Sequence, residues 1–178
     1  MEPPQGQVSQ IETNNNANYH ILFDKWTLWA HLPHDTDWSL KSYRKIIKFN
    51  WIEDVIALVN SVPDLMIKNC MLFLMRDGIN PTWEDPANVN GGCFSFKIPN
   101  KNIAKIWRDM VKVLTGETIS NDTKFLTNVN GLTISPKRSF CILKIWMKTL
   151  EYDDPSKICD INDLNIHGCL FKRHNSSK

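Results

Sequence analysis

The sequence lacks the features that mark membrane proteins, disulfide-stabilised proteins and general polyanion-binding proteins. No apolar run reaches the roughly 18 residues that cross a bilayer, and the N-terminus has no basic segment followed by an apolar one. The five cysteines show no C-x-x-C spacing, which is typical of reduced thiols inside the cell. The net charge is only +2, so any anion site must be a local cluster. We therefore expect a cytoplasmic or nuclear protein that does not contact membranes.

Clusters of catalytic or metal-binding side chains are also missing. The chain has no dense group of Glu residues that could hold the metal of a hydrolase, and its five histidines are scattered. We expect the histidines to be surface or structural residues. One combination, His167, Cys169 and His174, fits no standard zinc spacing. The sequence therefore predicts no enzymatic activity, no metal and no cofactor.

The chain of 178 residues is long enough for one domain with a sizeable core. Residues 1–18 are polar and rich in Pro, Gln and Asn, which predicts a disordered tail before a single domain over residues 19–178. Apolar periodicity predicts a helix over 50–62, a second over 102–117, and a short one near 155–164. Strands are predicted over 20–32, 70–79, 91–98, two around 136–138, and a weak one near 168–173. This order is typical of an α+β fold in which a curved antiparallel β-sheet carries helices on one face.

The seven tryptophans fall into different sequence contexts. We expect Trp26, Trp29, Trp51 and Trp107 in the core, because each lies in an apolar pattern. Two others, Trp38 and Trp83, lie in polar segments that contain Asp and Pro. Core packing stays open for both, but conspicuous loop aromatics often contact ligands.

The acidic residue beside Trp83 indicates what two such rings could hold. Base–aromatic stacking contributes roughly 1–3 kcal/mol per contact, and facing rings favour a cationic base. The Glu84 carboxylate could accept both N1–H and N2–H of guanine, a donor pair that adenine lacks. Lys137 and Arg138 would then contact phosphates, although alone they would indicate only a solvated turn.

Between His20 and Trp146 the chain resembles the eukaryotic translation initiation factor 4E family, which binds the 7-methylguanosine cap of mRNA. The resemblance is carried by "KWTLW" (25–29), "DWS" (37–39), "IED" (52–54), "RDGINPTWEDPANVNGG" (76–92) and "LTGETI" (114–119). It implies a monomeric cap-binding domain that acts in translation initiation. The implied fold has about three helices packed on the convex face of the sheet.

The resemblance also implies roles for individual residues. Trp38 and Trp83 match the two tryptophans that sandwich the methylated base, and Glu84 matches the carboxylate that bonds N1 and N2. The backbone N–H of Trp83 would bond the guanine O6. Trp146 matches the residue that touches the N7-methyl group, and Lys137 matches a phosphate-binding arginine.

Two departures from the family pattern affect the phosphates. Cys93 and Ile142 stand where basic residues are expected. Arg138 and Lys144 are candidates to compensate. We expect binding to depend less on phosphate number and on salt than in typical members.

Other departures affect the convex face, where family members bind a helical peptide from a scaffold factor or a repressor. His20, Glu53 and Asp109 match this surface, but Ile56 replaces its tryptophan anchor. Apolar positions are replaced by Arg108 and Lys112, the proline after His20 by Ile21, and the third helix is shortened over 153–165. Losing such an anchor should weaken an apolar helix contact.

Two functions stay open on this basis. The chain is an initiation factor with a modified partner surface, or it binds caps without the scaffold factor and sequesters, protects or represses mRNA. A general RNA-binding module would need a broader basic face than a net charge of +2 supplies.

Overall fold

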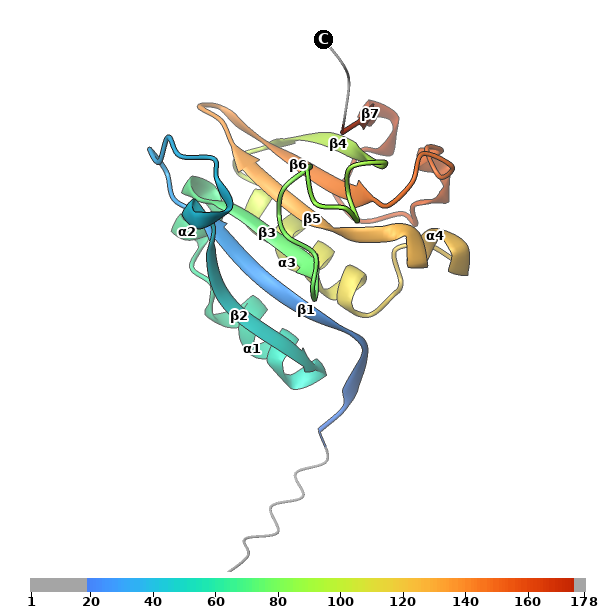
Figure 1. Ribbon diagram of the computed structural model, residues 1–178, viewed down its shortest axis with the longest axis horizontal. Coiled ribbons are helices and arrows are strands. Elements are labelled where there is room, and N and C mark those ends of the chain that lie inside the picture. The colour runs from blue at the N-terminus through green and yellow to red at the C-terminus, as the bar shows by residue number, and fades with distance from the viewer. Residues whose placement is uncertain (1–18, 175–178) are drawn as a thin grey trace, which may run out of the picture.

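The computed structural model describes residues 19–174, so the predicted disordered tail over 1–18 lies outside the described residues. Seven strands form one antiparallel sheet in the order β2-β1-β3-β5-β6-β4-β7, which confirms the α+β prediction (Figure 1). The strands are β1 (Ile21–His31), β2 (Arg44–Trp51), β3 (Met71–Arg76), β4 (Gly92–Pro99), β5 (Val129–Pro136), β6 (Phe140–Met147) and β7 (Leu170–Arg173).

Helices pack on one face of this curved sheet, as predicted. Within residues 19–174 the α-helices are α1 (Ile52–Ser61), α2 (Asp64–Asn69), α3 (Ile103–Thr115) and α4 (Thr123–Asn128). Helix α3 contacts α1, α2, β1 and β5, and Figure 1 shows α1 and α3 behind the sheet. Short α4 adjoins β5 at one end of the sheet. Single 3-10 turns occupy Leu40–Ser42, Pro155–Lys157 and Ile166–Gly168.

Side chains that alternate along each strand form two hydrophobic clusters, the main core on one face of the sheet and a smaller cluster on the other. On β1, Trp26 and Leu28 are fully buried in the cluster that includes the helices. Trp29 instead joins Phe73, Met75 and Trp146 on the opposite face. We call this opposite side, which carries no α-helix among the described residues, the open face. Because successive strand residues point to opposite sides, burying one set under the helices places the other set on the open face.

Several predictions of local structure and burial were incomplete or wrong. Residues 44–51 form strand β2, although a polar loop was predicted for its beginning. This strand lies at the edge of the sheet and most of its residues are exposed, so it shows no apolar alternation. Trp51, predicted to be in the core, is 37% exposed at the end of this strand. The helix predicted near 155–164 is one 3-10 turn, and α2 and α4 are too short for a periodic signal.

A mostly buried arginine of β3 joins the neighbouring strands β1 and β5 to the segments that follow α3. The Arg76 guanidinium donates to both Glu117 carboxylate oxygens at 2.7 and 2.9 Å, and to Asp24 Oδ2 at 2.9 Å. It also donates to the backbone oxygens of Val129 and Leu126 at 2.6 and 3.0 Å. Its side chain is only 12% exposed, so removing a partner leaves a charge poorly solvated.

We expect Glu117→Gln to lower the free energy of unfolding by about 2 kcal/mol, because it removes the charge opposite a largely buried guanidinium. Asp24→Asn is the matched control. Its carboxylate is 42% exposed, so its loss should cost less than about 1 kcal/mol. Urea denaturation measures both, and equal small losses would contradict a central role for the Arg76–Glu117 pair.

Candidate nucleotide-binding site

Trp38 is held at the surface by a buried histidine. The two rings of Trp38 and His31 stack at 4.2 Å with an interplanar angle of 3°. His31 is 2% exposed, its Nε2 lies 2.8 Å from the Asp37 carbonyl oxygen, and its ring meets Tyr43 edge-on at 5.2 Å. Trp38 itself is 57% exposed. One face of its ring is therefore supported by protein while much of the side chain stays accessible.

The loop before Trp38 is ordered by a short-range hydrogen-bonded turn. The Asp37 carboxylate accepts from the Ser39 N–H at 2.8 Å and from the Ser39 hydroxyl at 2.9 Å. The backbone bond from Ser39, followed by its hydroxyl bond, lowers the pKa of Asp37. A charged Asp37 at neutral pH keeps this turn, and so the position of Trp38, in place.

The loop that carries Trp83 and Glu84 is braced from inside by the residues that follow. Asp85 is 8% exposed and accepts from the backbone N–H groups of Asn80 and Ala87 at 3.0 and 2.9 Å. Fully buried Asn88 donates to the carbonyl oxygens of Asn80 and Thr82. Trp83, by contrast, is 45% exposed. Asp85 therefore has a structural task, and Trp83 and Glu84 are left for contacts outside the loop.

This loop is also tied to the sheet. The Asn130 side-chain amide donates to the Ala87 carbonyl oxygen at 2.7 Å and to Asn88 Oδ1 at 2.9 Å. Asn130 lies in β5 and is 3% exposed. Its bonds fix the loop against the sheet, which limits the freedom of the Trp83 ring.

Trp146 lies on the open face, mostly buried. Its side chain is 7% exposed, and its Nε1–H donates to Thr133 Oγ1 at 2.8 Å. The His174 ring lies 4.6 Å from it at an angle of 36°. Trp83, Trp146 and His174 all line one cavity of about 540 Å³ on the open face. The structure therefore brings Trp83 and Trp146 together.

Trp38 lines a different, smaller cavity of about 290 Å³, which it shares with Lys137. Burial first, and then the charge of Glu84, raises the pKa of the Tyr43 hydroxyl. Because Tyr43 packs against His31 beneath Trp38, Glu84 lies on the same side of the molecule as Trp38. Among the described residues no ring contact joins Trp38 to Trp83. The sandwich of a base between these two rings stays a prediction.

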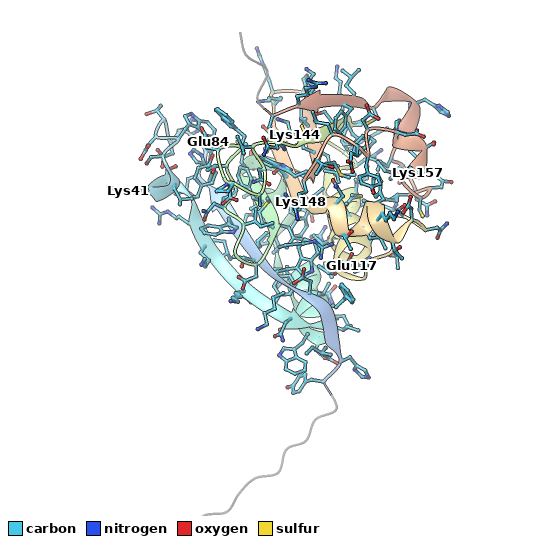
Figure 2. The ribbon with its side chains drawn as sticks, turned by 45° about the vertical axis from the view of Figure 1, so that its right-hand side comes forward. Lys41, Glu84, Glu117, Lys144, Lys148 and Lys157 are labelled. Atoms are coloured by element: carbon cyan, nitrogen blue, oxygen red, sulfur yellow. The ribbon has the colours of Figure 1, made fainter. Side chains whose placement is uncertain are left out.

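The basic residues divide between the two cavities. Lys144 lines the cavity of Trp83 and Trp146, together with Cys93 and Ile142. Figure 2 shows Lys144 and Glu84 in the upper half of the molecule, above Glu117. Lys137 lies beside Trp38, and its N–H bonds the Phe140 carbonyl oxygen at 2.8 Å to close the hairpin. Arg138 lines neither cavity.

Several residues of this region were not singled out from the sequence. They are His31 and Tyr43 beneath Trp38, Thr133 beside Trp146, and Lys97, Lys172 and His174 in the larger cavity. Alternation along β4 and β6 could have placed Lys97 and Lys144 on one side of the sheet. Nothing in the sequence indicates that His31 would stack on Trp38. Among the described residues no group of His, Cys, Asp and Glu could hold a metal ion.

On the convex face the predicted partner residues form two groups. His20 and Glu53 bind each other: His20 Nδ1 lies 2.7 Å from Glu53 Oε1, and this hydrogen bond lowers the pKa of Glu53. Ile56 is 54% exposed on α1. Asp109 forms ion pairs with Lys112 and Lys105 at 2.8 and 3.5 Å.

Arg108 has a structural role that the sequence did not indicate. Its guanidinium donates to the carbonyl oxygens of Val59 and Val62 and to Asp64, at 2.8, 3.0 and 2.7 Å. It therefore satisfies carbonyl groups at the end of α1 and links α3 to the start of α2. Because Arg108 and Lys112 both have acidic partners, they add less net charge to this face than the sequence suggested.

Comparisons with known proteins agree with this fold. The family model described as Eukaryotic initiation factor 4E matches residues 21–176. Eukaryotic translation initiation factor 4E of Eremothecium gossypii is 33% identical over 147 residues, covering 78% of this chain and 67% of that protein. The same factor of Saccharomyces cerevisiae is 30% identical over 138 residues, covering 73% and 62%.

Solved structures show the same architecture. The Ascaris suum eIF4E-3 complex with m7G cap superimposes with a TM-score of 0.71 at 18% identity, covering 89% of this chain and 93% of that chain. Schistosome eIF4E complexed with m7GpppG and 4E-BP gives 0.68 at 21% identity, covering 75% of each chain. These likenesses establish the fold.

Fold and sequence matches define an initiation factor, which is a binding protein and not an enzyme. The chain belongs to the eukaryotic translation initiation factor 4E family. Within residues 19–174 no helix is long and apolar enough to cross a membrane.

His174, which packs against Trp146, has a strongly shifted pKa. Burial, followed by the charge of Lys144, lowers the pKa of His174 to about 4. Between pH 6.5 and 4 the folded state therefore binds fewer protons than the unfolded state, so stability falls as the pH falls through this range. The packed arrangement is favoured at neutral pH.

We expect the melting temperature of the wild type to fall more between pH 7 and pH 4.5 than that of His174→Gln, which cannot titrate at this position. Thermal unfolding followed by circular dichroism at several pH values measures the difference. Carboxylate protonation affects both proteins alike, so parallel curves would show that His174 is not buried in solution.

Proposed function

We propose that the chain binds the 7-methylguanosine cap of mRNA on the open face of the sheet and acts, as a cytoplasmic monomer, in translation initiation. The observation that carries the proposal is the exposed Trp83–Glu84 pair on a loop whose next residues, Asp85 and Asn88, brace it from inside. The Ascaris suum and schistosome structures, described as complexes with m7G cap and m7GpppG, support it.

The base would be held by its faces and its edge. Trp38 and Trp83 would stack on the two faces of the methylated guanine, whose positive charge strengthens both contacts. Glu84 would accept from N1–H and N2–H as a charge-assisted pair. No backbone acceptor is seen for the Trp83 N–H among the described residues, so it is available to donate to O6.

The remaining contacts concern the methyl group and the phosphates. Trp146 would touch the N7-methyl group with the part of its ring that stays accessible, since its N–H is already bonded to Thr133. Lys137, which lines the cavity of Trp38, would contact the cap phosphates, and Lys144, which lines the cavity of Trp146, would contact a phosphate further along the ligand. Arg138, at the tip of the β5–β6 hairpin, would add charge at longer range.

Binding of 7-methyl-GTP, measured by tryptophan fluorescence beside unmethylated GTP, tests this function. Trp38→Ala and Trp83→Ala should each raise the Kd about 10- to 100-fold, because each removes one stacking contact worth roughly 1–3 kcal/mol. Glu84→Gln should raise it about 10-fold by removing a charge-assisted acceptor.

Trp51→Ala is the matched control, because Trp51 is an exposed tryptophan on the edge strand and should change the signal but not the Kd. Equal weak binding of 7-methyl-GTP and GTP by the wild type would end the proposal.

A second candidate function concerns the convex face. Ile56 is exposed where the family carries its tryptophan anchor, while the His20–Glu53 pair is in place. In one solved structure the schistosome factor is complexed with 4E-BP, so this fold can carry such a partner. We propose, as the second candidate function, that the lost anchor prevents recruitment of the scaffold factor and that the chain sequesters, protects or represses capped mRNA.

Titration with a fluorescent scaffold-factor peptide separates the two functions. We expect Ile56→Trp to tighten peptide binding at least 10-fold, since a central tryptophan anchor is typically worth about 2 kcal/mol or more. Leu65→Trp, at another exposed apolar helix position, is the control for added surface area. Wild-type binding at micromolar Kd or better would exclude the candidate function that does without the scaffold factor.

A further inference from the structure

The larger cavity of the open face carries more positive charge than the proposed cap contacts use. Lys97, Lys144 and Lys172 line it, and they come from the neighbouring strands β4, β6 and β7. No lining residue is Asp or Glu. The net charge of the whole chain is only +2, so this local excess is not a reflection of overall composition.

Some surface lysines are ion-paired, whereas these three are not, a condition that they share with Lys25, Lys41, Lys45, Lys101, Lys124, Lys137 and Lys148 among the described residues. Within residues 19–174, ion pairs with Asp residues hold Lys48, Lys68, Lys105, Lys112 and Lys157. In the same part of the chain no carboxylate lies within ion-pair distance of Lys97, Lys144 or Lys172. The Lys97 ammonium instead lies 4.4 Å from the centre of the Phe140 ring. Cations without carboxylate partners around an acid-free cavity fit an anionic ligand.

Strand register places the three lysines at the corners of a triangle on the open face. Lys172 pairs with Cys93, which also pairs with Trp146; Lys144 pairs with Ser95; and Lys97 pairs with Ile142. Lys97 and Lys172 are therefore four residues apart along neighbouring strands, and Lys144 lies midway between their levels on the other side of β4. With a rise of about 3.4 Å per residue and strands about 4.8 Å apart, Lys144 is roughly 8 Å from Lys97, and Lys97 and Lys172 are roughly 14 Å apart. A stacked nucleic-acid strand carries one phosphate per about 3.4 Å, so this span matches several successive phosphates.

The three lysines also lie toward the end of the sheet away from Trp38. Trp38 packs on His31 of β1, whereas β4 and β7 are the last two strands at the other end of the sheet order. Trp83 and Phe140 line the same cavity as the lysines and provide ring faces beside them. An RNA strand whose first base lies near Trp38 and Trp83 can therefore cross β6 and β4 toward the β7 edge.

We propose that Lys97, Lys144 and Lys172 bind the phosphodiester backbone of the first RNA nucleotides that follow the cap. This inference rests on the proposed cap-binding function and adds an RNA path to it. The replacement of expected basic residues by Cys93 and Ile142 leaves the cap phosphates with fewer partners. The three lysines then place the electrostatic contribution further along the RNA.

The test compares 7-methyl-GTP with a capped hexanucleotide over a range of salt concentrations, using wild type and Lys97→Gln/Lys172→Gln. We expect the wild type to bind the capped hexanucleotide about 10-fold more tightly at low salt. The slope of log K against log salt should be steeper for the hexanucleotide by about 2, since a single strand contributes roughly 0.7 per phosphate contacted.

The double variant should lose most of this gain and about 1.4 of the slope, while its Kd for 7-methyl-GTP changes less than about 2-fold. Lys68→Gln/Lys157→Gln removes the same charge from lysines that do not line this cavity and should keep the gain.

The outcomes separate the two proposals. Tight 7-methyl-GTP binding with no further gain from the RNA would overturn the RNA path and leave cap binding in place. A gain that both double variants lose equally would also overturn it, because net charge alone would then explain the effect. Failure of the wild type to bind 7-methyl-GTP would overturn both.

Discussion

The packing of α1 and α3 against one face of the curved sheet is the constraint on which the rest of the molecule depends. It buries alternate residues of every central strand, such as Trp26, Leu28 and Leu74. The intervening residues, among them Trp29, Phe73 and Trp146, must then face the other way. The same packing that stabilises the fold therefore supplies the floor of the candidate site, and no separate folding element is needed to build it.

Above that floor, the proposed binding groups are placed by hydrogen bonds made by their neighbours. Asp85 and Asn88 satisfy the backbone of the loop that carries Trp83, and Asn130 attaches the loop to β5. His31 supports Trp38 in a similar way by stacking beneath it. Buried polar groups of this kind restrict exposed rings before a ligand arrives, which reduces the entropy lost on binding.

How much the sequence could predict depended on how local each signal was. The strands β1, β3 and β4 and the helices α1 and α3 follow from apolar periodicity, and the loop between β3 and β4 from its Pro and Gly residues. Edge strand β2 was not predicted, because most of its side chains are exposed to solvent and show no apolar alternation. The sequence predicts a surface cation at Arg108, because its carbonyl partners in and just after α1 lie 46 and 49 residues away. Contacts across such separations leave no periodic mark.

The candidate site was predictable in part for the same reason. Trp38, Trp83 and Glu84 stand out from their own loops, whereas Trp146 was assigned only by resemblance to the family. Thr133 and His174 reach Trp146 through strand pairing, and His31 reaches Trp38 through the fold of the loop after β1, so single-sequence inspection did not find them. Lys97 and Lys172 share the cavity because β4 pairs with β7, and Lys144 joins them because β4 also pairs with β6.

Strand β7 has a consequence of its own. It is four residues long and pairs only with β4, so fraying it from the sheet costs far less than unfolding the central strands. Fraying would withdraw Lys172, and His174 just beyond it, together from the open face, while β4 and β6 stay paired. The extent of the open face therefore depends on the equilibrium between paired and frayed β7. A ligand that binds along β7 stabilises the paired state, and by linkage the paired strand strengthens binding of that ligand by the same free energy.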